Sequence, residues 1–317
     1  MRRMVLAALC LAMIALPASS ALAEDDAVVI ENMGRTTAYE TAPESAAALS
    51  YSIAEIMVAL GLEDKIVAVA PSMYILDQVS EEYREAVGSF PLLKGNYGVP
   101  SLETVLDTNA EFVFGDSYSF YASSVGTPED FEAAGVKVYA TEGTCYKDAT
   151  FENIYNDILN IGRIFRVEER AQELVAQLRE RAAVLEEKVG GLEPVSVFYF
   201  DSDTGGGVEM ATIGNTGLQS LMVRMAGGEN IFGDVDGQFI TVSWEDVVDR
   251  DPTYIVVCDY YGEGYAEEKI EGMKTNPATM EMDAVKNDRF IVVPGLAMFP
   301  SLECMDAVEL MADGLHP

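Results

Sequence analysis

Apolar residues recur at spacings of three and four between Glu168 and Val189, near the middle of the chain. This spacing places them on one face of a helix, with charged residues on the opposite face. Glu168 and Glu169 stand in the first turn, where carboxylates interact favourably with the helix dipole, and Gly190 follows the last turn. The pattern predicts one helix of roughly 33 Å, at about 1.5 Å per residue. We expect this helix to join two lobes.

Short apolar runs alternate with amphipathic segments on both sides of this helix. Ile66 to Ala70 and Phe112 to Phe114 are typical of buried parallel strands in the first half, as are Val195 to Phe200 and Tyr254 to Val257 in the second. The alternation predicts an α/β fold with two Rossmann-like lobes, each containing a parallel-type sheet. The expected organisation is a signal peptide over 1–23, an N-terminal lobe over 24–167, a linking helix over 168–189 and a C-terminal lobe over 190–317.

The two halves also share individual residues. The segment Ser101 to Asp107 matches Ser243 to Asp249, with serine, glutamate, valine and aspartate identical in register. The same register places the predicted strand at Phe112 opposite the one at Tyr254. An internal repeat of this kind implies two lobes related by a pseudo-two-fold axis.

The N-terminus has the pattern of a secretory signal. Arg2 and Arg3 precede an apolar run, and small residues end at Ala23, just before an acidic stretch. The apolar run from Val5 to Pro17 is too short to span a bilayer as a helix. We expect cleavage near Ala23 and an exported, periplasmic protein that is soluble once the signal is removed.

Charge and rare residues narrow the function classes. The formal net charge of −33 opposes binding to nucleic acids and to anionic membranes. His316 is the single histidine, so a Ser-His-Asp or Cys-His hydrolase and a histidine-rich metal site are both excluded. Its place beside the C-terminus predicts a frayed end. Cys145, Cys258 and Cys304 follow the signal, an odd number that leaves one disulfide open. We expect no enzymatic activity, no metal ligated by a dedicated cluster and no resident cofactor.

The loops after the predicted strands are rich in tyrosine, and they would line the cleft between two such lobes. Tyrosine joins a flat apolar face to a hydroxyl group, which suits a bulky ligand with polar edges. Core or loop packing is the alternative role for any one of these rings. Tyr118, Tyr121, Tyr260 and Tyr261 are favoured because they follow strands closely. The candidate ligand-binding residues are Tyr51, Tyr74, Tyr97, Asp116, Tyr118, Tyr121, Asp201, Tyr260, Tyr261 and Phe299.

Two glutamates stand at matching positions of the internal repeat. Glu103 and Glu245 each open a predicted helix, where a carboxylate gains about 0.3–1 kcal/mol from the dipole. Helix capping alone would explain either residue. Their duplication on two lobes favours a further role, because two carboxylates a fixed distance apart can dock on paired basic sites of a symmetric partner.

Several motifs, in order along the chain, resemble the helical-backbone (class III) substrate-binding proteins of ABC importers. That family carries ferric siderophores, haem and cobalamin. The resemblance implies modest hinge motion, a monomer, and delivery of the ligand to a membrane permease dimer whose arginines would meet Glu103 and Glu245. The segments that carry the resemblance are Leu60 to Val67, Tyr97 to Glu103, Gly227 to Phe232, Val242 to Val248 and Arg250 to Pro252.

The resemblance further implies that the cleft holds an iron-siderophore-type chelate or another metal-organic complex. The strand-end loops contain no arginine, which favours a neutral or weakly charged hydroxamate complex, a corrinoid, or a ligand held by tyrosine. Haem ligated by tyrosine stays open, whereas haem ligated by histidine does not. The competing hypothesis is an enzyme that uses the carboxylates of Asp116, Asp201 and Asp259 as acid, base or metal ligands.

Overall fold

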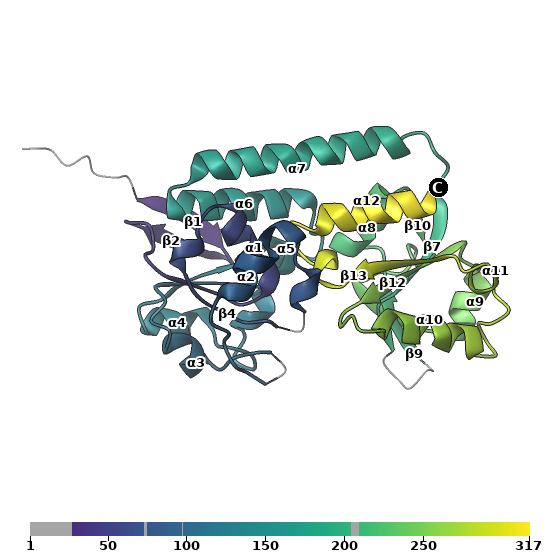
Figure 1. Cartoon of the computed structure of the whole chain (residues 1–317), viewed down its shortest axis with the longest axis horizontal. Coiled ribbons are helices and arrows are strands. Elements are labelled where there is room, and N and C mark those ends of the chain that lie inside the picture. The colour runs from purple at the N-terminus through teal and green to yellow at the C-terminus, as the bar shows by residue number, and fades with distance from the viewer. Residues whose placement is uncertain (1–26, 73–74, 97, 204–208) are drawn as a thin grey trace, which may run out of the picture.

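The computed structural model describes residues 27–72, 75–96, 98–203 and 209–317. Two α/β lobes lie side by side, and one long helix extends across both (Figure 1). The predicted signal peptide and the candidates Tyr74 and Tyr97 lie outside the described residues. Within the described ranges, no helix combines the length and apolar character needed to cross a membrane.

The N-terminal lobe is built on four parallel strands in the order β4-β3-β5-β6. The inner strand β3 consists of three alanines, all fully buried, whose small side chains let helices pack closely on the sheet. A separate hairpin of β1 and β2 precedes the sheet. The elements are β1 (Val28–Asn32), β2 (Arg35–Tyr39), β3 (Ala46–Ala48), α1 (Tyr51–Ala59), β4 (Ile66–Val69), α2 (Glu81–Ser89), α3 (Leu102–Leu106), β5 (Phe112–Gly115), α4 (Pro128–Ala133), β6 (Lys137–Ala140), α5 (Glu142–Cys145) and α6 (Phe151–Phe165), with short 3-10 turns η1 (Glu63–Lys65), η2 (Leu76–Gln78) and η3 (Ser117–Phe120).

The C-terminal lobe has a second parallel sheet, in the order β10-β7-β12-β13. A three-stranded antiparallel sheet, in the order β11-β9-β8, is added to it. The elements are β7 (Val195–Phe200), β8 (Ser202–Asp203), β9 (Glu209–Ile213), α8 (Leu218–Met225), β10 (Gly228–Asn230), β11 (Phe239–Ser243), α9 (Trp244–Arg250), β12 (Tyr254–Asp259), α10 (Tyr265–Thr275), α11 (Asp283–Lys286), β13 (Phe290–Pro294), η4 (Leu296–Met298) and α12 (Cys304–Leu315).

The two parallel sheets have the same topology. In each sheet, the strand that comes first in the chain lies between the second and the third, and the fourth lies at the edge. The segments that match in sequence occupy matching places, since α3 precedes β5 and α9 precedes β12. Their first residues are capped alike: the hydroxyl of Ser101 accepts a hydrogen bond from the Thr104 amide, and that of Ser243 from the Asp246 amide, each at 3.2 Å. The predicted fold class and the repeat are confirmed at the level of topology.

Helix α7 (Glu168–Val189) has the bounds that the apolar spacing predicted. Its buried face packs on α6 of the N-terminal lobe and on α8 and α12 of the C-terminal lobe. The approach to α6 is close, because a Cβ atom at Gly162 would come within 2.4 Å of the Ala171 Cβ atom. Arg181 pairs with Glu309 of α12 at 2.9 Å. Both lobes are therefore fastened to one rigid element.

A single hydrophobic cluster continues from one lobe into the other. It includes Tyr51 and Phe114 of the first lobe together with Met298 and Met305 of the second. Since opening the lobes widely would expose part of this cluster to water, the shared core favours small relative motions.

The sequence did not indicate the antiparallel strands, the β1–β2 hairpin, α6 or α12. The strands are short and half exposed, so they lack a clear period. The prediction of a frayed C-terminus is wrong: α12 continues to the buried Leu315, and the His316 Nε2 atom lies 3.3 Å from the Gly227 carbonyl oxygen. The open question of a disulfide is also answered, since Cys145, Cys258 and Cys304 are all free thiols.

Candidate functional site

The carboxyl ends of the parallel strands carry the loops that the sequence singled out, and side chains from opposite lobes meet around them. Gln78, in η2 of the N-terminal lobe, reaches two strand ends of the C-terminal lobe. Its amide nitrogen donates to the Asp259 carbonyl at 2.6 Å, and its amide oxygen accepts from the Leu296 N–H at 3.0 Å. A hollow of about 700 Å³ beside this contact is lined by Tyr261 and Asp77 among others.

A second contact between the lobes involves the loop after β6. The Lys147 ammonium group lies 3.2 Å from the Asp236 carboxylate, and both side chains are largely exposed. Nearby in the sequence, Gly143 of α5 abuts Pro300, because a Cβ atom on the glycine would come within 2.6 Å of the proline ring. The two lobes are thus in contact through separate N-terminal segments, at Gln78 and at residues 143–147.

In the N-terminal lobe, η3 separates core and surface aromatics. Phe120 is buried and packs edge-on to Phe131, with ring centroids 5.9 Å apart. Tyr118 and Tyr121 are 45% and 58% exposed, although burial and the nearby Asp116 raise the pKa of the Tyr118 hydroxyl. The Ser117 hydroxyl donates to the Thr144 carbonyl at 2.6 Å, which ties the loop after β5 to the loop after β6. These two tyrosines have the free surface that a ligand-contacting ring needs.

Asp116 begins the same loop but is held by a neighbour. The Thr141 hydroxyl donates to its Oδ1 atom at 2.8 Å. Burial raises the pKa of Asp116 to about 6, although the bond from Thr141 lowers it. This carboxyl group therefore changes charge at mildly acidic pH.

In the C-terminal lobe the aromatic rings form a continuous row. Phe239 of β11 stacks on Phe299, with centroids 6.4 Å apart and ring planes at 24°. Phe299 is 6.4 Å from Tyr260, Tyr260 is 6.2 Å from Tyr261, and Tyr261 packs edge-on to Tyr265 at 4.9 Å. We call these five residues the aromatic row. It presents apolar ring faces in a fixed arrangement.

Asp201 and Lys269 hold this row from beneath. The Tyr260 hydroxyl donates to the buried Asp201 carboxylate at 2.6 Å. The Lys269 ammonium group donates to the carbonyl oxygens of Asp201 and Cys258, at the ends of β7 and β12, and lies 4.4 Å from the Tyr265 ring centroid. Burial lowers the pKa of Lys269. The carboxylate of Asp201 is thus used to position a tyrosine.

The other predicted residues are distributed unevenly. Tyr51 is buried at the start of α1, within the core that the lobes share, so its ring offers little surface to a ligand. The Asp259 carboxylate accepts hydrogen bonds from the backbone of its own loop, from Gly262 at 2.8 Å and Tyr261 at 3.3 Å. Within the described residues, no group of three or more metal-ligating side chains is found.

Sequence reasoning missed four residues of this region. Phe239 and Tyr265 complete the aromatic row, Lys269 anchors it, and Tyr146 is an exposed ring just after α5. Tyr146 follows a predicted strand at a short distance and could have been found by the same rule as Tyr118. Phe239 lies on a strand that the sequence did not indicate, and no local signal would have placed it against Phe299.

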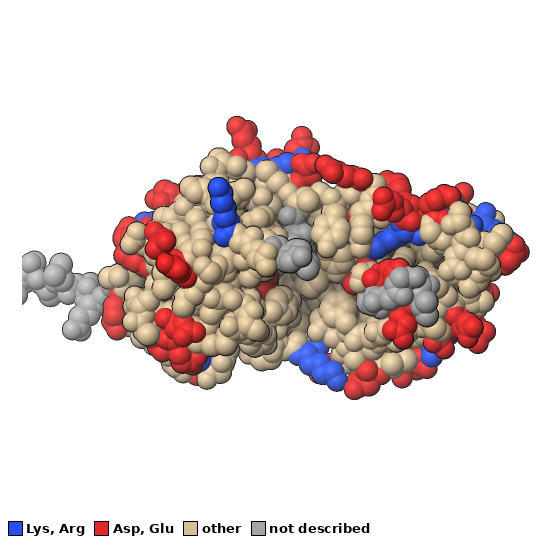
Figure 2. All heavy atoms as spheres, turned by 90° about the horizontal axis from the view of Figure 1, so that it is seen from below, with Lys and Arg blue, Asp and Glu red and all other residues tan. Residues whose placement is uncertain are grey.

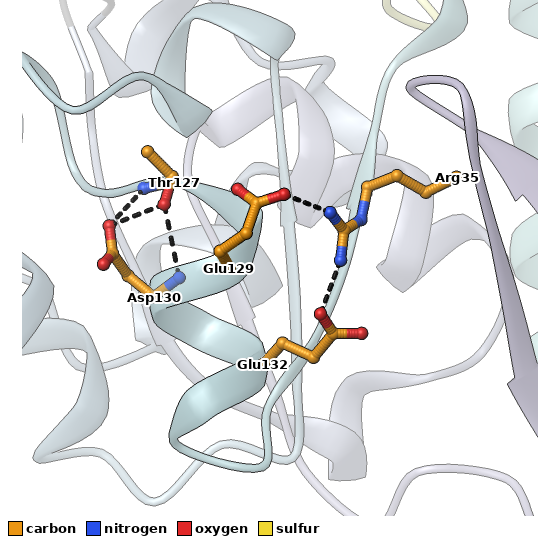
Figure 3. A network of polar contacts seen from close by, with 5 residues as sticks. All are labelled: Arg35, Thr127, Glu129, Asp130 and Glu132. Carbon is orange, nitrogen blue, oxygen red and sulfur yellow. Dashed lines mark hydrogen bonds and ion pairs between the residues drawn. The ribbon is translucent and has the colours of Figure 1, made fainter.

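Glu103 and Glu245 are exposed in the first turns of α3 and α9. The face seen from below carries acidic side chains over both lobes, with largely uncharged surface between them (Figure 2). Neighbouring acids are not all available: Arg35 of β2 pairs with Glu129 and Glu132 of α4 (Figure 3). Neither Glu103 nor Glu245 has an ion pair or side-chain hydrogen bond within the described part of the chain.

A profile described as periplasmic binding protein matches residues 47–296 of the chain. The chain belongs to this family. A substrate-binding lipoprotein of an ABC transporter from Bacillus subtilis (strain 168), YvrC, is 25% identical over 87% of this chain and 81% of the relative. A vitamin B12-binding protein from Yersinia pestis (strain Pestoides F) is 28% identical over 68% of this chain and 70% of that protein.

Solved structures agree with this assignment. A periplasmic binding protein from Veillonella parvula dsm 2008 is 26% identical, with a TM-score of 0.80 over 92% of this chain and 97% of its own. A protein of an ABC-type Fe3+-hydroxamate transport system from Saccharomonospora viridis DSM 43017 is also 26% identical, with a TM-score of 0.74 over 92% of this chain and 99% of its own. The family consists of extracytoplasmic substrate-binding proteins that serve ABC permeases rather than of enzymes.

Proposed function

We propose that this periplasmic binding protein captures a metal-organic chelate of the iron-siderophore type between its lobes and delivers it to an ABC permease. The exported form would begin near Glu24, and its bound chelate would be cargo. The aromatic row is the observation that carries this proposal. Five rings, held by Asp201 and Lys269, offer a rigid apolar surface with hydroxyl groups at its edge. Such a surface suits a bulky, compact ligand with polar edges.

The charges around the strand ends favour a chelate with little net charge. The Lys269 ammonium group is engaged by two backbone carbonyls, and Lys147 is paired with Asp236. A strongly anionic chelate would meet carboxylates such as Asp116 and Asp201, while the ammonium groups of Lys269 and Lys147 are already engaged. A neutral ferric hydroxamate avoids that cost. The likeness to the Fe3+-hydroxamate transport protein, at 26% identity, supports the same choice.

A corrinoid is the second candidate, and the vitamin B12-binding relative at 28% identity favours it. A corrin ring presents a broad face that could lie against the aromatic row. We rank it second because the matched part covers 68% of this chain, whereas the hydroxamate-type structure aligns over 92%.

Native mass spectrometry of residues 24–317 with ferric hydroxamates, ferric catecholates, haem and cobalamin tests the ligand class. The expected result is a one-to-one complex with a ferric hydroxamate and none with ferric catecholates. Retention of cobalamin alone would replace the first candidate by the second. Absence of any complex would overturn the chelate proposal and leave the family assignment intact.

We propose that Glu103 and Glu245 dock the loaded protein on the permease dimer as a monomer. Charge-assisted contacts to arginines at both lobes would fix its orientation. In cells, the double variant Glu103→Ala/Glu245→Ala should lose at least about tenfold in import rate, with an unchanged dissociation constant for the chelate in solution. The matched control is Glu180→Ala/Glu187→Ala, two exposed acids of α7, which lies across the opposite side of the molecule (Figure 1). Equal import by both double variants would contradict the docking assignment.

A further inference from the structure

Two glutamates meet in the interior where the lobes join, away from the aromatic row. Glu55 lies in α1 of the N-terminal lobe and is 0% exposed. Glu303 stands immediately before α12 of the C-terminal lobe and is 6% exposed. The side chains of Glu55 and Glu303 lie within hydrogen-bonding reach of each other. Ionised carboxylates are almost never fully buried without a cation or several donors, so this pair requires a physical explanation.

The hydrogen bonds around the pair are too few for two carboxylates. The Ser80 amide donates to Glu55 Oε1 at 3.1 Å. The Oε2 atoms of Glu55 and Glu303 are both buried and have no hydrogen-bond partner within the described residues. A proton on one of these oxygens would turn an acceptor into a donor, and the facing carboxyl oxygen would then accept from it. One proton therefore satisfies two atoms that are otherwise unpaired.

The electrostatic surroundings also favour an added proton. Burial raises the pKa of Glu55, and the neighbouring Glu303 carboxyl group raises it further. Burial likewise raises the pKa of Glu303. Asp306 of α12 raises the pKa of both groups through its charge. Burial raises the pKa of the nearby Tyr83 of α2, and the charge of Glu55 raises it further. The phenol of Tyr83 is uncharged, so it does not neutralise the Glu55 carboxylate.

Cations near this region are already engaged. Arg181 of α7 pairs with Asp306 and Glu309 of α12. The charge of Arg170 of α7 partly offsets the rise in the pKa of Tyr83, and the Nε atom of this arginine donates to the Ala59 carbonyl at 2.7 Å. The Cys304 thiol lies next to Glu303, and burial raises its pKa to about 12, so it stays neutral.

The pair is linked to the contact between the lobes through a short segment. Ser80, which donates to Glu55, is two residues from Gln78, which binds the Asp259 carbonyl and the Leu296 amide across the lobes. Glu303 follows Leu296 by seven positions, at the end of the same C-terminal segment. Separating the two carboxyl groups would displace the segments on both sides of the Gln78 hydrogen bonds to Asp259 and Leu296.

We propose that Glu55 and Glu303 share one proton, and that this proton holds the start of α12 against α1, so that the joint between the lobes loosens when the proton is lost. This inference does not depend on which ligand the cleft binds. Glutamate in the unfolded chain titrates near pH 4.3. The stabilisation is therefore complete below that pH, and it decreases as the pH rises toward the titration of the pair itself.

Titration of the glutamate side-chain carbons by NMR in the unmodified protein tests the shared proton directly. One glutamate carboxyl signal should remain protonated above pH 7 and should vanish in both Glu55→Gln and Glu303→Gln. Titration of every glutamate below about pH 6 would overturn the proposal, whatever the variants do.

Hydrogen exchange at the Ser80 and Leu296 amides tests the link to the joint. In the unmodified protein, their protection relative to the intrinsic rate should fall by up to tenfold per pH unit as the pair ionises. In Glu55→Gln/Glu303→Gln this dependence should disappear, while in the control Glu267→Gln, an exposed acid of α10, it should persist. Protection that is independent of pH in the unmodified protein would show that the pair does not control the joint.

Discussion

The third strand of each parallel sheet ends in the same short pattern, yet the two copies are supported differently. Asp116 and Tyr118 follow β5, whereas Asp259 is the last residue of β12 and Tyr261 follows it. Both tyrosines are about half exposed, at 45% and 51%. The Tyr261 ring packs on Tyr265 at 4.9 Å, whereas Tyr118 has no ring contact within the described residues. The C-terminal half of the candidate site is therefore preorganised, and the N-terminal half is freer to adjust to a ligand.

Polar residues just after the first strand of each parallel sheet explain part of this difference. Ser50 follows β3 by two positions and caps α1, since its hydroxyl accepts from the Ile53 amide at 3.2 Å. Asp201 follows β7 directly and holds the Tyr260 hydroxyl at 2.6 Å. Equivalent places in one topology thus stabilise a helix in one lobe and a ring in the other. Repeated topology does not imply repeated site chemistry.

Removing one ring from each half should give the largest difference in chelate affinity between the two halves. Tyr260→Ala removes the centre of the aromatic row and the hydroxyl that donates to Asp201 Oδ1, while Ser202 still donates to Oδ2. We expect about 100-fold weaker chelate binding, or about 2.7 kcal/mol, as for a central aromatic anchor. Tyr118→Ala should cost about fivefold, or about 1 kcal/mol. Titration calorimetry with the retained chelate, supported by unchanged circular dichroism, measures both. Equal losses would contradict a preorganised C-terminal half.

Asp116 and Asp259 should differ in how they make the free energy of unfolding depend on pH. The pKa of Asp116 is raised by burial from 3.8 to about 6, so its contribution is complete below pH 3.8 and is lost as the pH rises through 6. This rise in the pKa corresponds to at most about 3 kcal/mol in the free energy of unfolding, and partial exposure of Asp116 reduces that contribution to about 2 kcal/mol. Urea unfolding from pH 4 to 7 should show a larger decline in the unmodified protein and in Asp259→Asn than in Asp116→Asn, which keeps only the decline due to other buried acids such as Glu55 and Glu303. An equal decline in all three proteins would assign the whole loss to those other groups.

The contacts that Gln78 and Lys147 make between the lobes should differ in strength. Gln78→Ala leaves the Leu296 amide without its acceptor and removes one of the two donors to the Asp259 carbonyl, which keeps the Gly295 amide. The free energy of unfolding should fall by about 1–2 kcal/mol. Lys147→Ala breaks an exposed ion pair and should change it by less than about 0.5 kcal/mol. Denaturant unfolding of both variants at one pH measures the difference. A larger effect for Lys147→Ala would show that the contact at residues 143–147 is the stronger one.

Local patterns in the sequence were sufficient for much of the fold. The bounds of α7 follow from the spacing of its apolar residues, and Pro71 and Gly135 mark element ends because of backbone restrictions that act within a few residues. Ser101 and Ser243 could be recognised as caps because a cap bonds to an amide three positions away. The repeat of these segments then predicted two lobes of equal topology.

The composition of the site depended on contacts that no local pattern encodes. Tyr51 and Tyr118 both follow strands, yet one ring is buried and the other is exposed, because the surrounding helices decide which direction leads into the core. Phe239 of β11 packs on Phe299, which follows η4, and Gln78 donates to Asp259 of the other lobe. Glu55 and Glu303 interact although they are far apart in the sequence. Local patterns were enough to locate α7, several parallel strands and the residues that could serve a cleft, since those properties arise from neighbours in the chain. Which of these side chains meet was settled by the folded arrangement, because burial and pairing depend on distances through space.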